Sequence, residues 1–229
     1  MVKRVYTFRE GTKEMKDLLG GKGANLSEMT NLGLKVPPGF IITTNTCNDF
    51  LEAKGKFPEG LWMETLEHVL HLQENTGKRL NDSENPLLVS VRSGAPISMP
   101  GMMDTILNLG LNDGVAKTLV ELTGDEWFVY DSYRRLITMF GNVVMRAERG
   151  NFDAVHELEK EKEGVKNDTD ISIRGLKRTV EGMKKVYQKV VGSPFPTDPY
   201  EQLKLAIAAV FNSWNTPRAI TYRKAEGIP

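Results

Sequence analysis

The chain has 229 residues, 40% of them hydrophobic, which is enough to bury the core of one large domain or two small ones. Thirty basic and thirty acidic residues give a formal net charge of zero, so nothing in this balance favours a nucleic acid or an anionic membrane as partner. The one cysteine, Cys47, excludes an internal disulfide. No apolar run approaches the ~20 residues of a membrane span, and the first residues do not resemble a signal peptide. We therefore expect a globular, cytoplasmic protein.

A glycine-rich segment follows a short predicted first strand at residues 4–8. The segment, Leu18-Leu19-Gly20-Gly21-Lys22-Gly23, places a lysine at the start of a predicted helix. Free N–H groups, the positive end of the helix dipole and the ammonium group together favour an anion at this point. The segment is not a Walker loop, because Gly23 stands where Ser or Thr would bind magnesium. A plain helix-entry turn remains the alternative.

The next predicted elements are a strand and two helices. Residues 36–44 predict a buried strand, Thr44 is the expected cap of a helix over 45–54, and a longer helix spans 59–76. The apolar residues expected to face inward on these helices and on the preceding one are Leu26, Met29, Leu32, Trp62, Leu66, Val69 and Leu70. His68 and His71 have a spacing that could serve a metal ion, but no third ligand type recurs nearby, and we interpret them as part of a solvated face.

The segment 87–110 carries a second candidate phosphate-binding residue. Residues 87–92 alternate with a period of two and have apolar residues on both faces, which predicts an interior strand with Arg92 near its carboxyl end. Ligands collect at this end of open α/β sheets, and a guanidinium offers a planar fork of donors to phosphate oxygens. A loop over 93–104 and a second strand over 105–109 follow. The position of Arg92 alone does not distinguish a phosphate-binding arginine from an arginine that is paired with a carboxylate.

Residues beyond 111 have an almost wholly helical pattern. Helices are predicted over 113–122, 126–147, 151–162 and 172–191. We interpret 112–196 as a helical subdomain inserted into an α/β subdomain formed by 1–111 and 197–229, because three prolines in 193–199 mark the return. A helix over 200–214 and another from Pro217 complete the chain.

Two arginines occupy successive positions of the helix predicted over 126–147. At most one of Arg134 and Arg135 is therefore expected to share a face with Asp131 or Tyr133. For Arg134 the favoured interpretation is a surface arginine with a local partner. Spacing alone assigns no ligand to Arg135.

Four stretches of the sequence have distinctive combinations of residues. They are Gly-Gly-Lys at 20–22, Ser-Val-Arg-Ser-Gly-Ala at 90–95, Ser-Met-Pro-Gly-Met-Met-Asp-Thr at 98–105, and Trp214 to Arg223. Together they resemble the nucleotide-binding domain of the pyruvate, phosphate dikinase family, and the likeness covers the whole chain. Phosphoenolpyruvate synthase and the glucan, water dikinases share the Val-Arg-Ser core but have a more acidic sequence in place of residues 98–104. This segment is therefore specific to the subfamily.

The resemblance implies an α/β domain with an ATP-grasp-like fold that binds ATP together with Mg2+. The family's lysine and arginine correspond to Lys22 and Arg92, which are expected to be catalytic and to bind phosphate. The other expected ATP- and phosphate-binding positions are Gly101, Met103, Thr105 and Arg135. No metal ligand is assigned in this chain, because the ligands are expected mainly in a further segment of the nucleotide domain.

The resemblance also implies a phosphotransferase. The family's enzymes interconvert ATP, pyruvate and phosphate with AMP, phosphoenolpyruvate and pyrophosphate, through a phosphohistidine on another domain. The three histidines lie in segments predicted to be helical, without the small-residue loop of a phosphoryl carrier. We therefore interpret the chain as a fragment that is inactive alone. The expected partners are ATP, phosphate, and the phosphohistidine and pyruvate-binding domains of a longer, homo-oligomeric enzyme. Two alternatives stay open: the nucleotide domain of a phosphoenolpyruvate synthase or glucan, water dikinase, and a stand-alone nucleotide-binding module.

Overall fold

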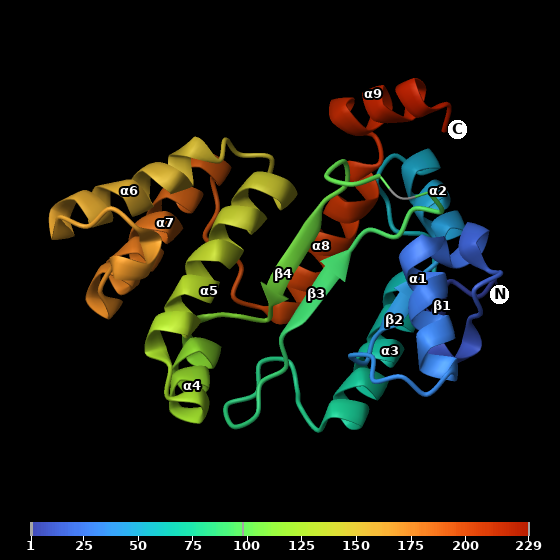
Figure 1. Cartoon of the computed structure of the whole chain (residues 1–229), viewed down its shortest axis with the longest axis horizontal. Coiled ribbons are helices and arrows are strands. Elements are labelled where there is room, and N and C mark those ends of the chain that lie inside the picture. The colour runs from blue at the N-terminus through green and yellow to red at the C-terminus, as the bar shows by residue number, and fades with distance from the viewer. Residues whose placement is uncertain (1, 98, 229) are drawn as a thin grey trace. The chain divides into compact units, whose positions relative to one another are not determined.

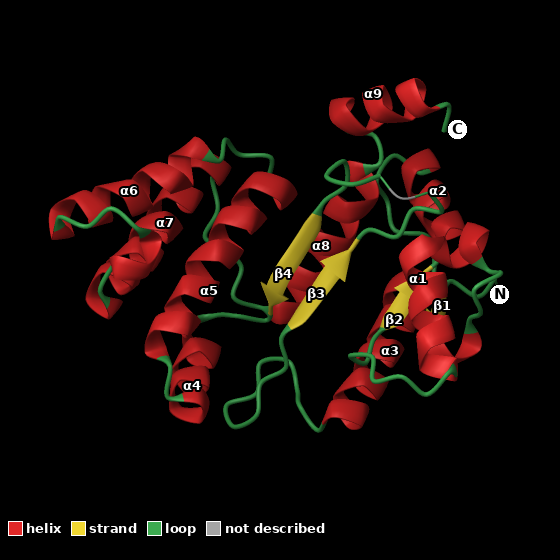
Figure 2. Cartoon of the chain, viewed as in Figure 1, coloured by secondary structure: helices red, strands yellow, loops and turns green. Residues whose placement is uncertain are grey.

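The computed structural model describes residues 2–97 and 99–228. Helices and short strands share the chain, which confirms the expected mixed α/β class (Figure 1, Figure 2). The elements are, in chain order, β1 (Val5–Thr7), η1 (Phe8–Glu10), α1 (Lys16–Asn31), β2 (Phe40–Ile42), α2 (Thr44–Glu52), α3 (Leu61–Thr76), β3 (Val89–Arg92), β4 (Thr105–Leu109), α4 (Asp113–Thr123), α5 (Glu126–Met139), η2 (Phe140–Val144), α6 (Gly150–Glu163), η3 (Asp168–Asp170), α7 (Ile173–Val191), α8 (Pro199–Ser213) and α9 (Pro217–Glu226). None of the helices in the two described stretches combines the length and the apolar character that a bilayer span needs.

The chain divides into two compact units. The first unit comprises Met1–Gly77, Arg92–Thr105 and Ile207–Pro229, and the second comprises Lys78–Val91 and Ile106–Ala206. Residues 112–196, which the sequence predicts to be an inserted helical subdomain, all belong to the second unit. Their separation as a subdomain of their own stays a prediction.

A small antiparallel pair of strands lies in the first unit. In this pair β1 runs against β2, with Val5 opposite Ile42. The carboxylate of Glu64, on α3, accepts hydrogen bonds from the backbone N–H groups of Arg4 and Val5, at 2.9 Å for the latter. The start of β1 is therefore fixed to α3. The unit's buried apolar side chains include Val5, Leu19, Ala24, Phe50 and Leu61.

The inward face of α1 differs from the expected one. Met29 is 40% exposed and Leu32 is 69% exposed, whereas Gly23 and Ser27 are buried. A Cβ added at Gly23 would lie 3.0 Å from the Cδ1 atom of Ile41 on β2. The prediction of a large apolar face was wrong because the helix approaches the strand so closely that only small residues fit between them.

Details of the two following helices also differ from the expectation. Thr43, not Thr44, is the N-cap of α2, because its backbone is extended and its Oγ1 accepts a hydrogen bond from the N–H of Thr46 at 3.3 Å. On α3, Leu70 is 56% exposed, since the buried stripe follows another face of the helix. That face contains Leu61, Thr65, Val69 and Leu72.

The helices of the second unit pack around α7, which contacts both α5 and α6. Four aromatic rings form part of this core, with neighbouring centroids 5.4 to 6.5 Å apart. They belong to Tyr133, Phe140, Tyr187 and Phe195. The long helix predicted over 126–147 ends earlier, at Met139, and continues as a π-helical turn through Val144. At this turn Gly141 leaves space for Phe152, whose ring would lie 2.3 Å from an added Cβ.

The strand that carries Arg92 is not an interior strand. β3 pairs with β4, and with no other strand of the described chain. Ser90 and Arg92 are exposed, whereas Val89 and Val91 are half-buried. The prediction was wrong because only one face of the strand is apolar to its end, which is the pattern of a strand covered on one side. Arg92 is nevertheless the last residue of β3, as expected.

A buried glutamine ties together two distant segments of the second unit. Gln202, on α8, is fully buried, and its Oε1 accepts a hydrogen bond from the N–H of Gly110 at 2.8 Å. Its Nε2 donates to the carbonyl oxygen of Leu111 at 3.1 Å and to that of Pro196 at 2.8 Å. One side chain thus joins the residues that precede 112 to the residue at position 196.

Candidate functional site

Helix α1 is broken at Gly20, inside the glycine-rich segment. Gly20 has φ 70° and ψ 163°, values that are not helical and that a side chain would strain. A Cβ at this position would lie 1.4 Å from the carbonyl oxygen of Gly94, in the loop after Arg92. Glycine is therefore required twice, once for the backbone angle and once for the close approach. The two motifs found in the sequence meet at this point.

A backbone hydrogen bond continues the contact. The N–H of Gly21 donates to the carbonyl oxygen of Ala95 at 2.9 Å. The helix resumes after Gly20, so Lys22 lies in the first turn that follows the break. The structure thus places the lysine at a helix start, where the positive end of the helix dipole adds to its charge.

Lys22 and Arg92 are both exposed and close in sequence to this contact. Among the described residues, neither side chain has a hydrogen bond or an ion pair. The alternative interpretation of Arg92, a structural pair with a carboxylate, therefore has no support in the described part of the chain. Two cations without a counter-charge beside a helix start can bind an anion such as phosphate.

The loop between the two strands and the first residue of β4 carry the other positions of the first unit that the sequence predicts to bind ATP. Gly101 has φ 74°, and no described residue lies within 4 Å of the position of its missing Cβ. Met103 and Thr105 are half-buried. The loop can therefore bring its backbone close to a ligand at Gly101 and present the Thr105 hydroxyl, as the sequence reasoning expects.

Sequence reasoning missed Arg218, a residue at the start of α9 that holds this loop. Its Nε donates to the carbonyl oxygen of Met102 at 3.1 Å, and its Nη2 forms an ion pair with the carboxylate of Asp104. The N–H of Asp104 in turn donates to the Oγ of Ser213 at 3.4 Å. The only signal in the sequence was the likeness of Trp214 to Arg223 to the family, which assigned no role to this arginine.

Arg135 belongs to the second unit, where it lies on α5. Its Nε pairs with Oδ2 of Asp131 at 2.8 Å, and its side chain is 60% exposed. Arg134 pairs with Oδ1 of the same carboxylate at 2.6 Å. The expectation that only one of the two arginines would share a face with Asp131 was wrong, because positions i+3 and i+4 both lie above position i on a helix.

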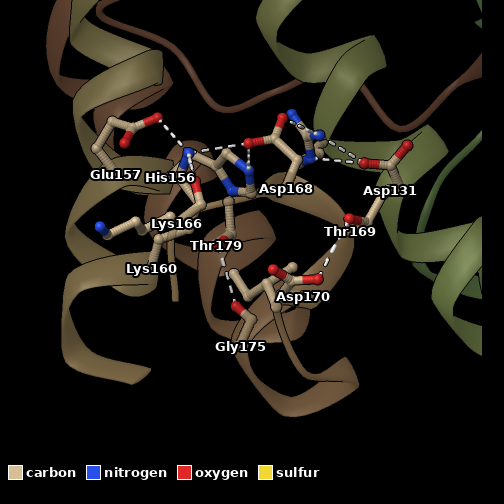
Figure 3. A network of polar contacts seen from close by, with 12 residues as sticks. Asp131, His156, Glu157, Lys160, Lys166, Asp168, Thr169, Asp170, Gly175 and Thr179 are labelled. Carbon is tan, nitrogen blue, oxygen red and sulfur yellow. Dashed lines mark hydrogen bonds and ion pairs between the residues drawn. The ribbon is translucent and has the colours of Figure 1, made fainter. Parts of the chain in front are cut away.

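Arg134 also differs from the expected surface arginine, since its side chain is buried. It bridges Asp131 and Asp168, and Lys160 and His156 approach Asp168 at 2.9 and 3.3 Å. Figure 3 shows Asp168 at the centre of this network. The hydrogen bond from Lys160 lowers the pKa of Asp168, so this carboxylate stays charged at neutral pH.

His156 is buried in the same network, and neither ring nitrogen makes a hydrogen bond with the described residues. Burial lowers the pKa of His156, the charge of Arg134 acts in the same direction, and Asp168 acts against both. The imidazole is therefore neutral at pH 7.

The other two histidines lie on α3. Nδ1 of His68 is 2.8 Å from the carbonyl oxygen of Glu64, and its ring is half-buried with its centroid 5.6 Å from that of Phe40. His71 is exposed beside Glu74. In the described residues, no three His, Cys, Asp or Glu side chains are grouped so that they could hold a metal ion.

A lysine in the first turn of a helix that contacts the loop after Arg92, on an α/β scaffold, is an arrangement suited to a phosphate group. Comparison with known proteins gives the family: the chain belongs to that of the pyruvate phosphate dikinase AMP/ATP-binding domain, whose model matches residues 16–56 and 53–229. The family match confirms the resemblance inferred from the motifs.

Individual relatives agree with the family match. The chloroplastic pyruvate, phosphate dikinase 1 of Arabidopsis thaliana is 54% identical over 230 residues, which cover 99% of this chain and 24% of that protein. The corresponding protein of Oryza sativa subsp. japonica is 53% identical, with the same coverage. The pyruvate, phosphate dikinase of Clostridium symbiosum is 47% identical over 100% of this chain and 26% of its own length. The chain thus spans about a quarter of the length of these curated relatives.

Proposed function

We propose that the chain binds ATP through its first unit, as the nucleotide-binding part of a pyruvate, phosphate dikinase. The observation that carries this proposal is the contact of Gly20 and Gly21 with Gly94 and Ala95, which brings the lysine and arginine motifs together. Lys22 and Arg92 neutralise the polyphosphate in this proposal. Gly101, Met103 and Thr105 supply the additional contacts in the first unit, and the role of Arg135 in binding phosphate is carried over from the family resemblance alone.

The proposed chemistry is a relay of phosphoryl groups. A histidine on another domain attacks the β-phosphorus of ATP and takes the β- and γ-phosphoryl groups together, which releases AMP. Inorganic phosphate then takes the γ-phosphoryl group from it to form pyrophosphate, and the histidine passes the remaining β-phosphoryl group to pyruvate. The products are AMP, pyrophosphate and phosphoenolpyruvate. Such transfers need positioning and charge neutralisation more than covalent help from the protein, and the two free cations fit that need. In this proposal ATP, phosphate, and the histidine and pyruvate-binding domains of a homo-oligomeric enzyme are the partners.

Mg2+ enters the proposal only as the usual companion of ATP. The described residues supply no set of three metal ligands, so no step here passes through the metal. We propose that its ligands lie on another part of a longer enzyme. The plant relatives are named chloroplastic and the Clostridium relative is not, so the cytoplasmic location also remains a proposal.

Calorimetric titration of the purified chain with a non-hydrolysable ATP analogue tests the binding proposal. We expect Lys22→Ala and Arg92→Ala each to raise the Kd about tenfold or more, because each removes a cation that faces phosphate. The matched controls are Lys35→Ala and Arg9→Ala, exposed cations of the same unit, which should bind as the wild type does. A wild-type chain that does not bind, or equal binding by all variants, would contradict the proposal.

A product assay tests the expectation that the chain is inactive alone. The purified chain is incubated with ATP, phosphate and pyruvate, and AMP, pyrophosphate and phosphoenolpyruvate are measured. We expect none to form, because the proposed relay needs the histidine carrier of another domain. Their formation would contradict the fragment interpretation without touching the binding proposal.

A further inference from the structure

We propose that Arg218 is a positioning residue that fixes the backbone of Met103 for the nucleotide. This inference rests on the proposed function, because it assumes that the loop over 99–105 meets ATP. It assigns a role to a residue that the motif reasoning left without one.

The backbone of Arg218 is fixed by a capped helix start. Thr216 is the N-cap of α9 and its Oγ1 accepts a hydrogen bond from the N–H of Ala219, while Pro217 occupies the first turn. The Thr216 hydroxyl also donates to the carbonyl oxygen of Ser213 at 3.0 Å, which ties α9 to the end of α8. Ala219 is fully buried. The guanidinium therefore extends from a rigid base.

Arg218 holds the loop on both sides of Met103. Its Nε donates to the carbonyl oxygen of Met102, the preceding residue, at 3.1 Å. Its Nη2 pairs with the carboxylate of Asp104, the following residue. No described residue lies within 4 Å of the position of a Cβ at Gly101. The hydrogen bonds of Arg218 hold the chain directly after this open position.

The same ion pair removes an unfavourable charge. Asp104 lies between Met103 and Thr105, two expected phosphate-binding positions, and an isolated carboxylate there would repel a polyphosphate. Its side chain is only 16% exposed, so water screens the charge weakly. Pairing with Arg218 cancels the charge, whereas Lys22 and Arg92 have no ion-pair partner in the part of the chain that the structure describes.

Only an arginine can supply both contacts at once. Its planar guanidinium has several donors in fixed directions, which suits a carbonyl oxygen and a carboxylate together. An ammonium group at this place keeps the charge but loses the fixed geometry. Arg218→Lys therefore separates the two roles.

The test measures nucleotide affinity, local order and folding in the same chains. We expect Arg218→Ala to raise the Kd of the ATP analogue about tenfold or more, and Arg218→Lys to restore only part of the affinity. Hydrogen exchange should become faster at residues 102–104 in both variants and stay unchanged in β1 and β2. The Tm should remain close to that of the wild type, since the Arg218 side chain is half-exposed. Lys224→Ala, an exposed cation of the same helix, is the matched control.

The outcomes separate this inference from the proposed function. Loss of binding in Arg92→Ala together with wild-type binding in Arg218→Ala would overturn the inference and leave the ATP site intact. Full restoration by Arg218→Lys would overturn the positioning geometry, because charge alone would then suffice. Absence of ATP binding in the wild-type chain would overturn the proposed function, and the inference with it.

Discussion

The backbone N–H of Gly21 donates a 2.9 Å hydrogen bond to the carbonyl oxygen of Ala95. This bond joins α1, directly after its break at Gly20, to the loop that follows β3. Each partner lies within three residues of an exposed cation, Lys22 on one side and Arg92 on the other. The backbone, rather than a side-chain contact, therefore joins the two segments that carry the candidate phosphate-binding residues.

The first prediction concerns Arg92 in a longer enzyme that contains this domain. We expect Arg92→Ala and Arg92→Lys both to slow phosphorylation of the carrier histidine by ATP about a hundredfold or more, roughly 3 to 4 kcal/mol, because lysine lacks the two-pronged donor geometry. Folding stability should change little, since the side chain is exposed and has no partner among the described residues. Rapid-quench kinetics and thermal unfolding on the same variants check both statements.

A structural arginine would give the reverse result. Breaking a buried pair with a carboxylate costs roughly 3 to 5 kcal/mol of stability. Near-normal phosphorylation in either stable Arg92 variant would remove this residue from the catalytic positions.

The second prediction concerns Gly20. An added methyl group would lie 1.4 Å from the carbonyl oxygen of Gly94. Gly20→Ala must therefore push the loop that follows Arg92 away from α1. We expect it to destabilise the chain by more than about 3 kcal/mol and to abolish binding of the ATP analogue. Urea unfolding and calorimetry measure the two effects.

Gly33→Ala is the matched control for Gly20→Ala. Gly33 has a similar φ of 78°, but no atom of residues 2–97 or 99–228 lies within 4 Å of its missing Cβ. It should cost only the backbone strain, about 1 to 2 kcal/mol, and leave binding intact. Equal losses of stability in the two variants would show that the close approach to Gly94 has no energetic weight.

The third prediction concerns the carboxylate shared by Arg134 and Arg135. Asp131→Asn leaves the buried Arg134 with Asp168 as its remaining acidic partner. We expect a loss of about 3 kcal/mol, the lower end of the cost of breaking a buried pair. Asp153→Asn, which breaks the exposed pair with Arg149, should cost less than about 1 kcal/mol. Chemical unfolding of both variants is the measurement, and similar small losses would show that the Asp131 pair contributes nothing.

The fourth prediction concerns the pH dependence of stability. The pKa of His156 is lowered in the folded chain, so below its ordinary value of 6.5 the unfolded chain takes up a proton that the folded chain resists. Stability should therefore fall as the pH decreases from 7.5 to 5.5. His156→Gln should flatten this slope. The pKa of Asp168 is lowered from its ordinary value of 3.8, so this group affects stability only at more acidic pH.

His71→Gln is the control for the pH experiment, because His71 is exposed and should leave the slope unchanged. The free energy of unfolding is measured by urea titration at several pH values. A slope in the His156 variant as steep as in the wild type would assign the pH dependence to other groups.

The fifth prediction concerns residues 112–196 as a separate helical subdomain. We expect native-state hydrogen exchange to show α5, α6 and α7 opening together, with a free energy different from that of β1 and β2. The exit at Gly110 and the proline-rich return motivate this expectation. Uniform protection, with all elements opening as one unit, would contradict it.

The sequence predicted the parts of the molecule that depend on local physics. Several helices end as expected, at Gly124 and Gly192 for example, because a glycine in the left-handed conformation closes each one. The glycine-lysine and arginine motifs were found because their residue sequences are distinctive. The small-residue face of α1 was missed, since it depends on how closely β2 approaches.

The contacts that sequence reasoning missed join residues far apart in the chain. Arg218 lies 116 residues from Met102, and Arg134 lies 34 residues from Asp168. No periodicity relates such positions, because the tertiary structure alone makes them neighbours. The burial of Arg134 was missed for this reason, although its pair with Asp131 follows from helical spacing.

The hydrogen bonds of Gln202 have a consequence for how such a chain can change in length. Gly110, Leu111 and Pro196 all bond to one side chain, so the chain leaves for residues 112–196 and comes back at a single place. A short peptide could close that gap, and a gene could gain or lose the whole excursion by one insertion or deletion without rethreading the rest.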